Sequence, residues 1–114
     1  MKRLGIILAG LWAHAAVAQD VALPSGQTVS LIEEIAEDQV LRLRYLAPWV
    51  AQGVSDEDLM HLCQTRALER LAGQPEVIIS LSEAQIRFGD TDPSVFQVFA
   101  PFTIDAGQCI GEAY

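Results

Sequence analysis

Apolar and polar residues alternate over several short stretches of the chain, and this pattern predicts β-strands. It is clearest in residues 39–47, where apolar side chains (Leu41, Leu43, Tyr45) alternate with Arg42 and Arg44. Further strands are expected at residues 28–35, 76–82, 84–89, 94–104 and 108–114. In the stretch 94–104, one face carries Phe96, Val98, Ala100, Phe102 and Ile104. Pro101 lacks a backbone donor, so this strand is expected to be an edge, to bulge or to break.

The first two of these strands are expected to form a hairpin across a short acidic turn. Pairing Ile35 with Leu41, and Leu31 with Tyr45, would bring the apolar residues together. The same register would set Glu34 opposite an arginine, Arg42, as a cross-strand pair of opposite charge.

Residues 55–72, SDEDLMHLCQTRALERLA, have the spacing of an amphipathic helix. Ser55 is a suitable N-cap, acids fill the first turn, and Gly73 followed by Pro75 suits the end. The apolar stripe comprises Leu59, Met60, Cys63, Ala67 and Leu71. We therefore expect an α+β fold, in which one helix packs on an antiparallel sheet of five or six strands and one disulfide is present.

The N-terminal residues have the pattern of a secretory signal peptide. A basic pair at residues 2–3 precedes an uncharged, mostly apolar run, and small residues at 16–18 predict cleavage between Ala18 and Gln19. The alternative is a membrane anchor, but a spanning helix needs about 20 apolar residues and this run has roughly half that number. Export to the periplasm, without a stable membrane anchor, is therefore expected.

Cleavage would leave 114 − 18 = 96 residues, enough for one domain with a modest core. We expect a loosely held N-terminal arm at residues 19–27 and a single α+β domain at residues 28–114. These 96 residues hold five arginines, no lysine and fifteen acids, so their charge is 5 − 15 = −10 with His61 neutral. Phosphate backbones would repel such a chain, so nucleic acid is not an expected partner.

Five segments resemble a family of short, exported, uncharacterised proteins from Gram-negative bacteria, known as a domain of unknown function. The segments are LRLRYLAP (41–48), HLCQTRAL (61–68), VIISLS (77–82), FGDTDPS (88–94) and FTIDAGQCIGEAY (102–114). Their order and spacing span nearly all of the chain after the leader. The resemblance implies an exported domain in which the helix cysteine and the C-terminal cysteine recur as a pair. It implies no activity.

The helix stretch DLMHLC combines an acid, a histidine and a cysteine, which are residue types of metal and redox sites. A structural zinc site needs four ligands, and a helix would point His61 and Cys63 about 200° apart. No metal site and no cofactor are therefore expected. Two cysteines in an exported chain favour a structural disulfide between Cys63 and Cys109. His61 is then a boundary residue that could bond to Glu57 or Asp58.

No catalytic residue is predicted. After cleavage His61 would be the only histidine available as a base, and no serine lies in a GxSxG-like context. Schiff-base chemistry needs a lysine, which residues 19–114 lack. Two carboxylates alone can hydrolyse glycosides, so a small carboxylate-dependent hydrolase is the alternative function.

The acidic loop FGDTDPS is the segment most like a ligand site. Asp90 and Asp92 could share a calcium ion, although a calcium loop normally has more acids within a dozen residues. The alternative, which we favour, is a turn in which the aspartates accept backbone hydrogen bonds before Pro93.

Trp49 and three arginines complete the candidates. Trp49 lies in the connection before the helix and is interpreted as a lid over the core edge, with a binding anchor as the alternative. Arg42, Arg44 and Arg87 could form a basic patch for an acidic ligand or could neutralise nearby acids. We expect a non-catalytic periplasmic binding or accessory domain that contacts a protein or envelope ligand through the exposed sheet face or the Trp49 loop. A structural envelope component is a further alternative.

Overall fold

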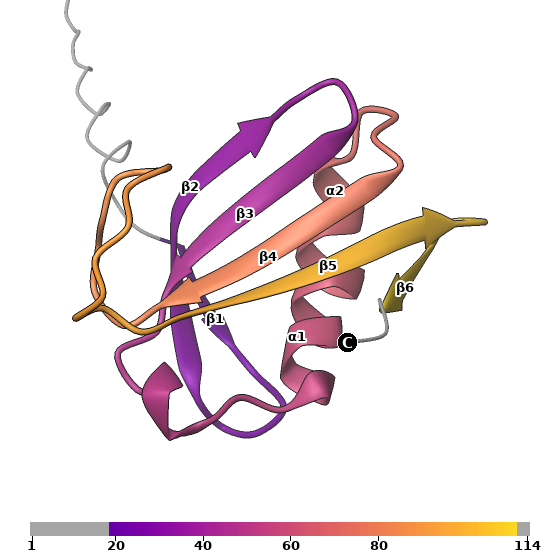
Figure 1. Cartoon of the computed structure of the whole chain (residues 1–114). Helices are drawn as coiled ribbons and strands as arrows, with labels where there is room; N and C mark the ends of the chain where they lie inside the picture. The colour runs from indigo at the N-terminus through magenta and orange to yellow at the C-terminus, as the bar shows by residue number, and fades with distance from the viewer. Residues whose placement is uncertain (1–18, 112–114) are drawn as a thin grey trace, which may run out of the picture.

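The computed structural model describes residues 19–111, which form a curled six-stranded sheet, a half-barrel, with one helical segment packed on one face (Figure 1). In spatial order the strands are β1 (Gln19–Ala22), β2 (Thr28–Ala36), β3 (Val40–Leu46), β4 (Glu76–Ser82), β5 (Gln97–Asp105) and β6 (Gln108–Gly111). The helical segment comprises α1 (Asp56–Leu62), the π-helical turn η3 (Cys63–Ala67) and α2 (Leu68–Arg70), after a short 3-10 helix, η2 (Val50–Gln52).

The expectation of an α+β fold with a purely antiparallel sheet is wrong. β3 and β4 run parallel, whereas the other neighbouring strands pair antiparallel. The helical segment connects β3 to β4, and a strand–helix–strand crossover returns the chain in its original direction. The fold is therefore mostly a mixed, curled sheet with one short helix. The disulfide is present.

One extra residue in β2 changes the register of the predicted hairpin. Leu31 lies opposite Tyr45 as predicted, but a β-bulge follows and shifts every later pair. Both remaining predicted pairs are wrong: Ile35 lies opposite Arg42 instead of Leu41, and Glu34 lies opposite Leu43 instead of Arg42. Glu34 consequently faces the helix.

The segment 19–27, expected as a loosely held arm, begins with a strand of the sheet. β1 pairs with β2 along its whole length, and Val21 is buried in the core. Gln19 accepts a hydrogen bond from Arg70 through Oε1 at 2.9 Å. The same guanidinium pairs with Glu34 at 2.9 Å, so the helix holds this corner of the sheet.

The core lies between the helix and the concave face of the sheet. Its largest fully buried side chains include Tyr45, Leu41, Leu43, Leu62, Ile79 and Leu81. The predicted N-cap is confirmed, since Ser55 Oγ accepts from the Asp58 N–H at 3.1 Å. Of the expected apolar stripe, Leu59, Cys63 and Ala67 are buried whereas Met60 and Leu71 are only partly so, and Leu62 joins the core.

Candidate binding surface

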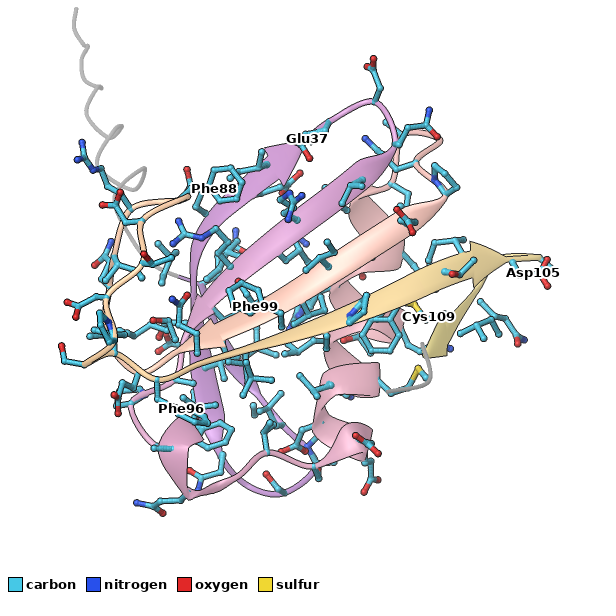
Figure 2. The ribbon with its side chains drawn as sticks, viewed as in Figure 1. Glu37, Phe88, Phe96, Phe99, Asp105 and Cys109 are labelled. Carbon is cyan, nitrogen blue, oxygen red and sulfur yellow. A yellow bond between two sulfur atoms is a disulfide. The ribbon has the colours of Figure 1, made fainter. Side chains whose placement is uncertain are left out.

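The sheet face opposite the helix carries apolar side chains that face solvent. Within residues 19–111 no second layer of secondary structure covers this face, which Figure 1 views directly, with the helix behind. The pairing of the strands places Arg42, Ile78 and Pro101 side by side on it. Phe99 lies beside this row, 60% exposed, and Figure 2 shows it in front of the sheet. We call Arg42, Ile78, Phe88, Phe99 and Pro101 the outer patch.

The connection between β4 and β5, residues 83–96, folds back over one end of this face. The strand expected at residues 84–89 is absent there, because this connection is a loop. Arg44 fixes the loop, since its Nη2 donates to the Ile86 carbonyl at 2.6 Å while Nη1 pairs with the Glu33 carboxylate. The loop therefore has a defined position against β3.

Phe88 is placed by this loop above two arginines. Its ring centre lies 5.4 Å from the Arg42 guanidinium carbon and 5.7 Å from that of Arg44, which are cation–π distances. The ring is nevertheless 48% exposed. Arg42 also pairs with Glu37 at 3.0 Å. Of the three arginines considered as a patch, Arg42 and Arg44 lie together beneath Phe88 and each pairs with an acid. Arg87 lies on the loop and pairs with Asp90 at 3.5 Å.

A groove adjoins the outer patch where β5 begins. Its volume is about 370 Å³, and its lining is Val50, Gly53, Val54, Asp56, Leu59, Phe96, Val98 and Phe99. We call this the β5 groove. Phe96 was expected on one strand face with Phe102, but it precedes β5, which begins at Gln97, and is 46% exposed. The Phe96 N–H donates to Glu83 Oε1 at 2.7 Å, which holds the chain at the groove entrance.

The stretch DLMHLC is helix, and its cysteine is structural. Cys63 forms the predicted disulfide with Cys109, with 6.3 Å between the two Cα atoms. Next to it the Cys109 N–H donates to Gln64 Oε1 at 2.8 Å. The helix and β6 are therefore joined by a covalent bond and a hydrogen bond. Within residues 19–111 no three histidine, cysteine or acidic side chains gather as a metal-binding cluster.

Asp58, expected as a partner of His61, has a different role. It is buried and accepts two hydrogen bonds from Ser25, from the N–H at 3.0 Å and from Oγ at 2.5 Å. These bonds tie the β1–β2 turn to the start of the helix. His61 is half-buried, and its carbonyl accepts from Thr65 Oγ1 at 2.6 Å.

The two aspartates of the acidic loop build a turn. Asp92 Oδ1 accepts from Ser94 Oγ at 2.7 Å and from the Ser94 N–H at 3.0 Å, and these bonds lower the pKa of Asp92. Asp90 donates its N–H to the Arg87 carbonyl at 3.0 Å. The turn interpretation accounts for both residues.

Trp49 is half-buried against the core, as its interpretation as a lid requires. Its indole Nε1–H donates to the Thr28 carbonyl at 2.9 Å and so ties the connection before the helix to β2. The next residue, Val50, lines the β5 groove.

A hydrolase of the carboxylate type needs two acids across one cleft. The hollow beneath Phe88, about 650 Å³, contains one carboxylate, Glu33, which is paired with Arg44. The β5 groove contains only Asp56. Asp90 and Asp92 line a third hollow, but both are exposed on the loop. The first two hollows therefore hold one carboxylate each, and only the exposed hollow on the loop holds two.

The fold defines the class: a disulfide-linked domain with one helix on a curled, mixed sheet. The chain matches the model of the Family of unknown function (DUF6497) over residues 8–114, and it belongs to this family. No curated protein and no solved structure matches it. The expected family without known function is thus confirmed, whereas its Gram-negative origin and export remain predictions.

Residues 1–18, with the expected cleavage after Ala18, lie outside the described residues. Between residues 19 and 111 no helix is long and apolar enough to cross a membrane.

Proposed function

We propose that this protein is an exported, non-catalytic binding domain that contacts a protein partner through the outer patch. One observation carries the proposal: Phe99 is 60% exposed, beside Ile78 and Pro101, on a sheet face that no other described element covers. Full burial of such a side chain is worth about 1.5–3 kcal/mol, a gain that an apolar surface in water leaves unused. The export of the protein rests on the leader pattern of residues 1–18.

The composition of the patch supports a protein partner. Aromatic residues and arginine are enriched at the centres of protein–protein interfaces, and both occur here as Phe88, Phe99 and Arg42. The loop that carries Phe88 is held in place by Arg44, so the patch is largely preorganised before a partner arrives. The hollow beneath Phe88 and the β5 groove each contain a single carboxylate, so these two hollows give no support to the hydrolase alternative.

Photo-crosslinking in cells tests the proposal. A photo-reactive phenylalanine analogue replaces Phe88 or Phe99 in the full-length chain, and it replaces Glu69, an exposed helix residue, as the matched control. We expect a discrete adduct of one size from positions 88 and 99 and none from position 69. Adducts of equal yield from all three positions, or from none, would refute binding through the outer patch.

A further inference from the structure

The two exposed aromatic rings of the outer patch stand on opposite sides of β4. Phe88 lies above β3, with its ring centre 5.4 Å from the guanidinium carbon of Arg42 and 5.7 Å from that of Arg44. Phe99 belongs to β5, the neighbour of β4 on the other side. Figure 2 shows both rings on the face turned to the viewer. Ile78 of β4, directly opposite Arg42, lies between them.

The outer face is convex, because the sheet curls around the helix on its other face. β3 and β4 are the middle strands of the six, so they form the ridge of this convex face. A two-fold rotation about an axis that runs along β4 at the surface exchanges the two sides of that strand. It therefore carries the position of Phe88, above β3, onto the β5 side, where Phe99 lies. Such a surface is complementary to a second copy of itself, which is what a two-fold symmetric dimer requires.

The two rings also stand at nearly the same level along the strands. Phe88 is almost equally far from Arg42 and Arg44, which are successive outward positions of β3. Phe99 lies level with Arg44, because both pair with Ser80 of β4. Successive outward positions are about 6.8 Å apart, so the rings differ in level by about 3.4 Å. This offset allows Phe88 of one copy to meet Phe99 of another at the ring-centre distances of about 4.5–7 Å that aromatic pairs prefer.

The charges on this face cancel, whereas the rest of the described chain is strongly acidic. Three ion pairs lie on the face and on the loop above it: Arg42 with Glu37, Arg44 with Glu33, and Arg87 with Asp90. Beyond these, residues 19–111 contain two arginines and eleven acids, a charge of 2 − 11 = −9 with His61 neutral. A second copy that approached through the other surfaces would bring acids toward acids, which is unfavourable. The outer patch meets its own copy without this repulsion.

We propose that the partner bound at the outer patch is a second copy of this chain, packed face to face about a two-fold axis along β4. Each Phe88 lies against Phe99 of the other copy, and the two Ile78 side chains meet on the axis. Facing sheets pack about 10 Å apart, and these side chains occupy the space between them. The inference rests on the proposed function and deepens it, since it names the partner of the same surface.

The charge of the chain determines how salt changes this association. Each copy has a formal charge of −8 at pH 7, so two copies repel each other at long range. Salt shortens the Debye length from about 8 Å at physiological ionic strength to about 3 Å at 1 M and so screens this repulsion. The dimer should therefore become tighter as the NaCl concentration rises. A basic partner would show the opposite dependence.

Serine substitutions measure the contribution of the rings. Sedimentation velocity of the purified, oxidised full chain, over a wide range of concentration, gives the dissociation constant of the dimer. Phe99→Ser and Phe88→Ser should each raise this constant by at least about a hundredfold, because symmetry removes two buried rings from the interface. Phe96→Ser is the matched control, since Phe96 is similarly exposed but lies off the outer patch, and it should stay within about threefold of wild type. Circular dichroism and thermal melts establish that each variant folds.

Mapped crosslinks test the arrangement independently of the serine variants. Isotope-labelled and unlabelled chains, each with the photo-reactive phenylalanine analogue at position 88, are purified, mixed and irradiated. We expect an adduct that joins a labelled to an unlabelled chain, with the crosslink between position 88 and the peptide that contains Phe99. The analogue at position 99 should in turn crosslink to the peptide that contains Phe88.

Other outcomes contradict the inference. A chain that remains monomeric at every concentration, with position 88 crosslinked in cells to a different protein, refutes the second copy and leaves the proposed function standing. A dimer that Phe99→Ser leaves intact lies on another surface, and a crosslink that joins position 88 to position 88 contradicts the axis along β4. A dimer that salt weakens contradicts the charge argument. No adduct from positions 88 and 99, in cells or in the purified chain, refutes the proposed function as well.

Discussion

Replacement of both cysteines by alanine should destabilise the whole domain. The Cys63–Cys109 bond spans a sequence separation of 46, so 46 − 1 = 45 residues are enclosed, including β4 and β5. The chain-entropy model gives about 4 kcal/mol for a loop of that length. Both cysteines are buried, so the substitutions also remove core contacts. Small domains have total stabilities on the order of 5–15 kcal/mol, so the variant loses a large fraction of its stability.

Thermal unfolding of the oxidised protein measures this loss. At about 4–8 °C per kcal/mol, the melting temperature of Cys63→Ala/Cys109→Ala should fall by well over 10 °C. Gln64→Ala is the control, since it removes the neighbouring hydrogen bond to Cys109 and leaves the disulfide; about 1 kcal/mol is expected. Peptide mapping under non-reducing conditions should recover the linked pair. Two free thiols in the native protein, or equal melting temperatures, would refute the reasoning.

Three further predictions concern stability. Burial raises the pKa of Tyr45 to about 12, whereas the pKa in the unfolded chain is near 10. The stability that the protonated Tyr45 contributes is therefore fully present below pH about 10 and is lost as the pH rises toward 12. Alkaline denaturation should show a loss of about 2–3 kcal/mol in the free energy of unfolding that Tyr45→Phe lacks. Asp58→Asn should lower the free energy of unfolding in urea by about 1.5–3 kcal/mol, because the buried carboxylate accepts two hydrogen bonds from Ser25. Asp56 is exposed, so Asp56→Asn should change it by less than about 0.5 kcal/mol, and equal effects would contradict this. Phe99→Ser should alter the free energy of unfolding by no more than about 0.5 kcal/mol, and a larger loss would place Phe99 in the core.

Local signals in the sequence predict the parts of the fold that depend on neighbours along the chain. Alternation gives β3 and β4, and the cap at Ser55 gives the start of the helix. The disulfide follows from the count of cysteines. The parallel pairing of β3 and β4 depends instead on where the helix returns the chain, and the bulge after Leu31 depends on packing across the sheet. Neither has a local signal.

The exposed sheet face was predicted as a contact surface, but the residues that form the outer patch were not, for a related reason. Alternation in β5 correctly separates Phe102, which is buried, from Phe99, which is on the other face. It does not say that this face lacks a covering layer, because that depends on the path of residues 83–96. The last expected strand, residues 108–114, is confirmed over Gln108–Gly111, and its remaining residues lie outside the described part of the chain.

The disulfide fixes the position of β6 in the sheet. Cys109 is fixed to the helix by its sulfur and by Gln64, so β6 cannot slide along β5 without breaking both. A shift of one residue would also turn Cys109 to the opposite face of the sheet. The register that sets Phe102 opposite Gly111 and Asp105 opposite Gln108 is therefore held by covalent chemistry. Since disulfides form and persist mainly in oxidising compartments, the expected export and the position of β6 depend on the same two sulfur atoms.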